Sequence, residues 1–147
     1  PYRIKVTGRT KHFINVFGEE LIIENTDKAI KIATQKTQTE IVDYTAAPIF
    51  MEGKSKGAHE WIIEFKTPPK DLQYFVELLD NYLKTLNSDY EAKRYNNITL
   101  NMPKVHVAQK GLFHKWMKKN NKLGGQHKIP RLSNSRLFIE ELFSLTK

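Results

Sequence analysis

The clearest pattern in the chain is an apolar stripe with helical spacing that follows Asp71. Its residues recur at i, i+3, i+4 and i+7, which places their side chains on one face of an α-helix. They are Leu72, Phe75, Val76, Leu79, Leu83 and Leu86. Just before this stripe, Thr67-Pro68-Pro69 ends the preceding segment, because proline lacks the N–H group that a strand needs. The pattern predicts a helix that opens at Asp71 and buries the stripe in the core.

Shorter segments alternate between apolar and polar residues or are rich in apolar ones, and they predict β-strands. These segments cover residues 2–6, 13–17, 41–51, 59–65 and 104–107. The first two flank a glycine-containing reversal at Gly8 and predict a β-hairpin. Pro48 lies late in its strand, which favours an edge or a bulge there. In the strand 59–65, one face carries Trp61, Ile63 and Phe65 and the other carries Glu60, Ile62 and Glu64.

Further helices are predicted from capping residues and apolar spacing. Thr26 is expected to cap a helix that begins at Asp27 and presents Ala29, Ile30, Ala33 and Thr37 on one face. Helical turns are predicted over residues 88–95, and a short basic helix over residues 112–119. Ser133 or Asn134 is expected to cap the last helix, whose buried face is formed by Leu137, Phe138, Leu142 and Leu145.

The order of these elements predicts the fold class. From Phe13 onward the order is β, α, β, β, α, β, which is that of a ferredoxin-like βαββαβ core. A hairpin precedes this core and two helices follow it, so we expect an α+β fold. The 147 residues suit a single domain that spans residues 1–147. A strand-like pattern starts within two residues of Pro1, and we therefore expect the chain to be part of a longer polypeptide.

Composition excludes several kinds of site. The chain has no cysteine, so it has neither disulfides nor thiolate metal ligands, and an intracellular, reducing environment is expected. The five histidines show no i, i+4 pair on a helix, and we expect no metal site. No apolar run reaches the length of a membrane span. We therefore expect a cytoplasmic protein that does not bind a membrane.

Charge is distributed unevenly, although the net charge of the whole chain is +8. Between Glu91 and Glu140 there is no acidic residue, while eleven lysines and arginines lie in that interval. The positive charge is therefore local, and it indicates an anionic partner. Nucleic acid, a phosphate-bearing ligand or an acidic surface of another domain would each fit.

Motifs of a self-sufficient enzyme are missing from the sequence. It contains no Walker loop and no GxGxxG pattern. Glu19 and Glu20 are interpreted as surface acids, and His59 as a partly buried, hydrogen-bonded residue. Phe113 and Trp116 are expected to hold the basic helix against the domain.

Tyr90 and Arg94 are four residues apart, so they share a helix face. We expect them to tie the end of the long helix to a neighbouring element.

The loop Gln126-His127-Lys128-Ile129-Pro130-Arg131 follows Gly124-Gly125 in the acid-free region. A lysine placed there is a compact, mobile cation that can reach a phosphate, whereas Arg131 offers a rigid fork of donors. The alternative interpretation is a solvated basic loop.

Several of these motifs, taken in order, are similar to a known family. They are the Gly8-Arg9 hairpin with its following Gly18-Glu19, the Gly57-Ala58-His59-Glu60-Trp61 strand start, Leu86-Asn87 with Tyr90 and Arg94, Gly111-Leu112-Phe113, and the Gln126 to Arg131 loop. Nearly end to end, the chain resembles the carboxy-terminal domain of the auxin-responsive (Gretchen Hagen) acyl acid-amido synthetases, in a bacterial-type form. That family is a branch of the adenylate-forming enzymes.

The resemblance implies a function for a longer polypeptide. An amino-terminal domain would bind ATP, Mg²⁺ and a small carboxylic acid, and the acid would be adenylated and then conjugated to an amino acid. The present domain would be a mobile cap that closes over that site. Lys128 would be the catalytic residue, brought to the adenylate phosphate. Gln126 and Arg131 would order the loop or touch nucleotide, and Arg9 would line the acceptor path.

Two departures and two alternatives accompany this interpretation. His127 stands where the plant motif has tyrosine, and no ATP-binding motif lies within the chain, so the chain alone is not expected to turn over. A basic ferredoxin-like module that binds nucleic acid is the first alternative, although no RNP-like signature is visible and we expect no nucleic acid. A purely structural interaction domain is the second.

Overall fold

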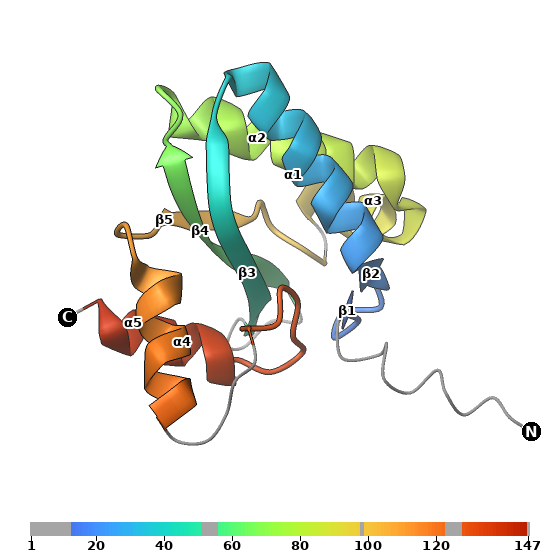
Figure 1. The fold of residues 1–147 in the computed structure, drawn as a ribbon. Helices are drawn as coiled ribbons and strands as arrows, with labels where there is room; N and C mark the ends of the chain where they lie inside the picture. Colours follow the sequence, from blue (N-terminus) through green and yellow to red (C-terminus); the bar gives the residue numbers. More distant parts are fainter. Residues whose placement is uncertain (1–12, 51–55, 98, 123–127, 147) are drawn as a thin grey trace, which may run out of the picture.

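The computed structural model describes residues 13–50, 56–97, 99–122 and 128–146, and Figure 1 shows their arrangement. The strands are β1 (Phe13–Ile14), β2 (Leu21–Ile22), β3 (Glu40–Phe50), β4 (Gly57–Thr67) and β5 (Lys104–Val107). The helices are α1 (Ile23–Thr37), α2 (Leu72–Leu86), α3 (Ser88–Arg94), α4 (Leu112–Lys122) and α5 (Leu137–Leu145), with a 3₁₀ turn at Tyr95–Asn97. The predicted α+β class and the two helices that follow the core are confirmed.

The main sheet is mixed and has the order β3-β4-β5. β3 and β4 are antiparallel, with Tyr44 opposite Ile63, whereas β5 runs parallel to β4, with Val105 opposite Trp61. The chain passes from β4 to β5 through α2 and α3, which is the crossover that a parallel pair requires. β4 is therefore the central strand of this sheet.

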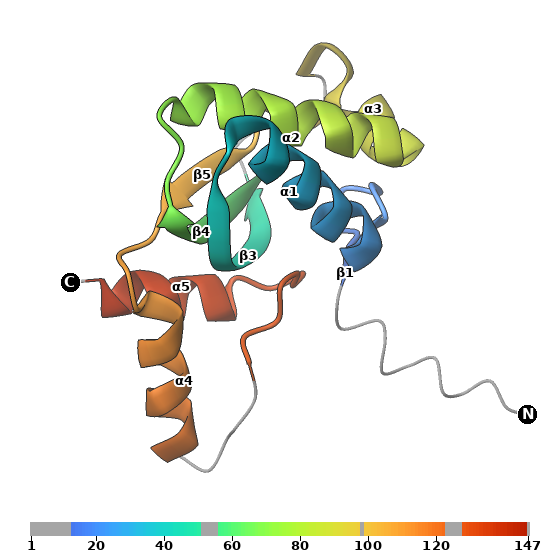
Figure 2. The ribbon, with the colours of Figure 1, turned by 45° about the horizontal axis from the view of Figure 1, so that its top comes forward.

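Helices cover both faces of the sheet. α1 and α2 lie on one side, and α4 and α5 lie on the other (Figures 1 and 2). The predicted alternation along β4 is confirmed, because Trp61, Ile63 and Phe65 belong to the core under α1 and α2, while Ile62 belongs to the core under α4 and α5. Two hydrophobic layers therefore enclose the sheet.

α2 forms as its sequence pattern predicts. The Asp71 side chain accepts a hydrogen bond from the backbone N–H of Tyr74 at 3.2 Å, which caps the helix. Phe75, Leu79 and Leu83 are fully buried. Each buried side chain of this size contributes about 1.5–3 kcal/mol to folding.

α1 begins earlier than expected. Its first residue is Ile23, and the Asn25 side chain accepts a hydrogen bond from the N–H of Ile22. The predicted cap Thr26 lies inside the helix instead, where its hydroxyl donates to the Ile23 carbonyl and contacts the Tyr44 hydroxyl. The Thr26 hydroxyl therefore serves a buried network and not the end of the helix.

The first predicted strand of the core lies outside the main sheet. β1 pairs with β2 in a separate two-stranded hairpin, because Gly18 and Glu20 have positive φ angles of 84° and 43° and turn the chain back at once. As a result β5 pairs directly with β4, in the place that the first strand occupies in a ferredoxin-like sheet. The predicted strand 2–6 lies outside the described residues.

The residues expected to cap the last helix have other partners. The Ser135 hydroxyl, rather than that of Ser133, accepts a hydrogen bond from the N–H of Leu137, the first residue of α5. Asn134 instead bonds to the hairpin.

Among the helices that the structure describes, none has the length and hydropathy needed to cross a membrane.

Candidate functional site

The segment that follows Lys128 runs along the free edge of β3. The Pro130 carbonyl accepts a hydrogen bond from the Thr45 hydroxyl at 2.7 Å, and the Arg131 carbonyl accepts one from the N–H of Ala46 at 2.8 Å. Two residues later, the N–H of Ser133 donates to the Ala46 carbonyl at 3.2 Å. The segment is therefore held like a short additional strand, and its bridge to β3 is parallel.

Lys128 is exposed immediately beside a buried anchor. The side chain of Ile129 is only 4% exposed and packs in the core under α4 and α5, whereas Leu132 is fully buried in the core on the opposite side of the sheet. These two side chains fix the segment between both cores. Lys128 thus presents a cation to solvent from a backbone that is well anchored on its carboxy-terminal side.

Arg131 is engaged by two carboxylates of its own domain. Its Nη1 lies 3.0 Å from Oδ1 of Asp27 in α1, and its Nε lies 3.1 Å from Oδ1 of Asp43 in β3. The guanidinium also lies over the Tyr44 ring, 5.0 Å from its centroid. Burial alone would lower the pKa of Arg131, but the charges of Asp43 and Asp27 raise it above its ordinary value. Arg131 therefore ties residues 128–134, which we call the Lys128 segment, to α1 and β3.

Tyr44 also belongs to this cluster of Arg131, Asp27 and Asp43. Its hydroxyl donates a hydrogen bond to Oδ1 of Asp27 at 2.6 Å and lies 2.7 Å from the Thr26 hydroxyl. Burial raises the pKa of Tyr44 strongly, and the hydrogen bond to Asp27 raises it further. Tyr44 thus stays a neutral donor that orients the Asp27 carboxylate.

A shallow hollow of about 260 Å³ lies beside the cluster and is lined by Asp27, Ile30, Lys31, Thr34, Ile41, Tyr44 and Arg131.

Of the four site residues predicted from the sequence, Lys128 and Arg131 lie within the described residues, and Gln126 and Arg9 lie outside them. His127 also lies outside. The structure thus brings Lys128 and Arg131 onto one anchored segment, with Lys128 exposed and Arg131 bound to carboxylates. The partners Asp27 and Asp43 carry no signal in the sequence, because they are separated from Arg131 by 104 and 88 positions.

The basic helix α4 is fixed by a buried acid. Glu64 of β4 is 5% exposed, and its carboxylate accepts hydrogen bonds from the backbone N–H groups of Gly111 at 2.8 Å and Phe113 at 3.2 Å. Because a helix N-terminus carries partial positive charge, this carboxylate stabilises the start of α4. Phe113 and Trp116 are buried in the core between α4, α5 and the sheet, which confirms their predicted packing role.

The outer face of α4 carries part of the positive charge of this region. Its exposed basic side chains are His114, Lys115, Lys118 and Lys119. Glu64, the acid that fixes the start of the helix, is buried and is not part of this exposed face.

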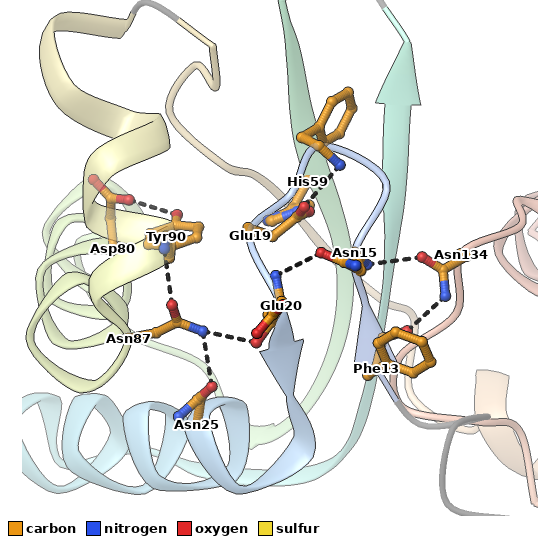
Figure 3. A network of polar contacts seen from close by, with 11 residues as sticks. Phe13, Asn15, Glu19, Glu20, Asn25, His59, Asp80, Asn87, Tyr90 and Asn134 are labelled. Carbon is orange, nitrogen blue, oxygen red and sulfur yellow. Dashed lines mark hydrogen bonds and ion pairs between the residues drawn. The ribbon is translucent and has the colours of Figure 1, made fainter. Parts of the chain in front are cut away.

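Glu19 was expected at the surface and is buried instead. It has no exposed surface, and its Oε2 lies 2.6 Å from Nε2 of His59, which is 1% exposed (Figure 3). The other carboxylate oxygen accepts a hydrogen bond from the N–H of Phe17. The hairpin turn folds Glu19 inward onto β4, a placement that neighbouring residues cannot reveal. The prediction that His59 is hydrogen-bonded is confirmed, but the residue is fully buried and not partly buried as expected.

Tyr90 and Arg94 tie α3 to α2, as expected. The Tyr90 hydroxyl donates to Oδ1 of Asp80 at 2.7 Å, and Arg94 also bonds to Asp80. The Tyr90 ring stacks on His59 with centroids 5.8 Å apart. This buried network joins α3, α2 and β4. In the described part of the chain, no three His, Asp or Glu side chains are grouped as metal ligands would be.

Comparisons with known proteins agree with this fold. The model of the GH3 family C-terminal domain matches residues 24–137. A solved structure of AtGH3.15 acyl acid amido synthetase in complex with 2,4-DB superposes with a TM-score of 0.69 at 15% identity, covering 91% of this chain and 25% of that chain. A second structure, of GH3.15 acyl acid amido synthetase, gives a TM-score of 0.71 at 16% identity and covers 92% and 26%.

The chain thus spans about a quarter of the length of these two proteins. No curated protein matches it by sequence.

Proposed function

This chain belongs to the GH3 family, as its C-terminal domain, and from that membership we propose that it is the mobile cap of an ATP-dependent acyl acid amido synthetase. The longer polypeptide would adenylate a small carboxylic acid and then pass the acyl group to the amine of an amino acid. An amino-terminal adenylation domain would hold ATP and Mg²⁺ and would be the partner of the present domain. This domain would close over the nucleotide for at least one of the two steps.

The observation that carries the proposal is the placement of Lys128. Its side chain is exposed, while the next residue, Ile129, is buried and the peptide groups of Pro130 and Arg131 are bonded to β3. A cation held on an anchored segment loses little freedom when it meets an anion. During adenylation, negative charge builds on phosphate oxygens, and a lysine delivered on closure stabilises that charge in a site from which water is excluded. We assign this role to Lys128.

Arg131 has a different part in the proposal. Its guanidinium already pairs with the carboxylates of Asp27 and Asp43. These ion pairs favour a role in ordering the loop and not in direct contact with the nucleotide. Gln126 and Arg9 remain proposed nucleotide-proximal residues, Gln126 on the loop and Arg9 on the acceptor path.

The basic face of α4 would meet an acidic surface of the amino-terminal domain. Its exposed lysines carry part of the local excess of positive charge, and such a field would favour docking of the closed domain.

Binding of RNA through the sheet is less consistent with the geometry. Modules of that kind stack bases on an open sheet face. Here α1 and α2 cover one face and α4 and α5 cover the other. Glu60 and Glu64, on the face toward α4 and α5, are occupied by Arg136 and by the start of α4.

The test replaces Lys128 by alanine in the full-length protein and measures acid-dependent exchange of pyrophosphate into ATP. We expect exchange to fall about 100-fold or more, the usual loss when one charge-stabilising donor is removed. The matched control is Lys36→Ala, which removes an exposed lysine from α1, away from the basic face of α4. An unchanged exchange rate for Lys128→Ala, with an intact fold, would favour a cap or interaction domain without a residue in the chemistry.

A further inference from the structure

The Lys128 segment is tied to the β1–β2 hairpin by the side chain of Asn134. Its Oδ1 accepts a hydrogen bond from the N–H of Asn15 at 2.8 Å, and its Nδ2 donates one to the Phe13 carbonyl at 3.0 Å (Figure 3). The Asn134 side chain accepts one of these hydrogen bonds and donates the other, as a peptide group does between two paired strands. The side-chain amide therefore takes the place of a peptide group here. This fixes both the distance and the orientation between the hairpin and the segment.

The hairpin is itself a firm point of attachment. Glu19 reaches from it to His59 of β4, and the side chain of Asn87 donates to the Glu20 carbonyl at 3.0 Å. Asn87 is also the N-cap of α3, since it accepts a hydrogen bond from the N–H of Tyr90. Ile14 and Leu21, the inward residues of the two strands, are fully buried. The hairpin is therefore joined to β4, α3 and the core.

The segment between Lys128 and Asn134 is held along its length. Ile129 is anchored in one core, Leu132 in the other, and the intervening peptide groups bond to β3. The Asn134 side chain therefore adds a further point at which this anchored segment is held. The Asn134 side chain is exposed and buries little surface. Its two hydrogen bonds therefore serve to fix the position of the segment relative to the hairpin.

The geometry points to Asn134 as a positioning residue for Lys128, which couples the hairpin at the amino-terminal side of the domain to the segment that carries the lysine. This inference rests on the proposed function. In the longer polypeptide, the hairpin is the first described element after the amino-terminal domain that we propose. Because the hairpin and the segment are both fixed to the sheet, a rotation of this domain carries them together, and Asn134 keeps the lysine in a set place relative to the hairpin.

The experiment compares Asn134→Ala and Asn134→Asp in the full-length protein. Alanine removes both hydrogen bonds, whereas aspartate keeps the acceptor for Asn15 and loses the donor to Phe13. We expect alanine to lower the maximal rate of pyrophosphate exchange about tenfold with little change in the KM for ATP, because misplacement of a reacting group slows the chemical step. Aspartate should fall between alanine and the wild type. Asn120→Ala on α4, whose amide donates to the Trp116 carbonyl, is the control.

A double-mutant cycle separates positioning from a general loss of stability. If Asn134 acts through Lys128, Asn134→Ala should cost nothing more in a Lys128→Ala background. Additive losses, or a wild-type rate for Asn134→Ala, would overturn the inference. Failure of the proposed function is distinguishable, because it appears as an unchanged exchange rate in Lys128→Ala alone.

A second readout does not depend on activity. Hydrogen exchange at the Ser133 amide, which donates to the Ala46 carbonyl, should accelerate in Asn134→Ala at an unchanged global stability. Unchanged protection of that amide would contradict the positioning role.

Discussion

Arg94 and Asp80 form a buried two-point ion pair between α3 and α2. Nε of Arg94 donates to Oδ1 of Asp80 at 2.8 Å, and Nη2 donates to Oδ2 at 2.6 Å. Burial by itself would raise the pKa of Asp80, but hydrogen bonds from Arg94 and Tyr90 outweigh it and hold the pKa below its usual value. Parallel bonds of this kind are among the strongest charge-assisted contacts in proteins.

This pair predicts a dependence of stability on pH. A carboxyl group whose pKa is lower in the folded state contributes stability above its unfolded pKa of about 4 and loses it as the pH falls further. Asp80→Asn should therefore lower the free energy of unfolding by about 3 kcal/mol at pH 7, since it leaves the buried Arg94 charge without its carboxylate.

Urea denaturation at several pH values measures this effect. The difference between the wild type and Asp80→Asn should shrink as the pH falls below about 4, because the unfolded chain then binds a proton at Asp80 while the folded state, with its lowered pKa, still resists protonation. Glu77→Gln, an exposed site on the same helix, is the control and should change stability little. A difference that is constant down to pH 2 would contradict the assignment.

Gly57 is required by close packing at the start of β4. A Cβ atom there would lie 2.2 Å from Cζ of Phe17 and 2.8 Å from the Ile49 carbonyl oxygen. Gly57→Ala should therefore destabilise the domain by about 2 kcal/mol or more, because the hairpin or the backbone of β3 must move. Thermal unfolding of the variant in the 147-residue chain measures the loss.

Two further variants identify the cause. Phe17→Ala in the Gly57→Ala background should recover only part of the loss, because the contact with the Ile49 carbonyl remains. Gly111→Ala is the contrasting control, since its Cβ would meet nothing within 4 Å and its φ of +88° alone makes it costly, by about 1 kcal/mol. Full recovery in the double variant would place the whole clash at the Phe17 ring.

Arg131→Lys tests whether the forked guanidinium is needed to hold the Lys128 segment. A lysine is a single point charge and cannot bond to Asp27 and Asp43 with the geometry of Arg131. Because the side chain of Arg131 is 36% exposed, we expect a loss of only about 0.5–1 kcal/mol in unfolding free energy. Pyrophosphate exchange by the full-length protein should fall by more than this loss of stability explains.

The reverse exchange Lys31→Arg, at an exposed site beside the same hollow, is the matched control. If Arg131→Lys and Lys31→Arg change the unfolding free energy and the pyrophosphate exchange rate equally, the guanidinium of Arg131 is not what positions the segment.

The sequence by itself determined the elements whose signals are local. The stripe of α2, its Asp71 cap, the two-faced pattern of β4 and the start of α4 after Gly111 all depend on residues within a few positions of one another. The ordered motifs of the chain also sufficed to indicate its family.

Only the tertiary structure decided which distant groups meet. Glu19 reaches His59 across 40 positions, Arg131 reaches Asp27 across 104, and Asn134 reaches Asn15 across 119. The same applies to the sheet, in which β5 lies beside β4 because the first strand pairs with β2 instead. Periodicity and capping describe which face of an element is buried, but the choice of partner depends on packing of the whole chain. The physical role of the Lys128 segment therefore became visible only when β3, α1 and the hairpin were placed around it.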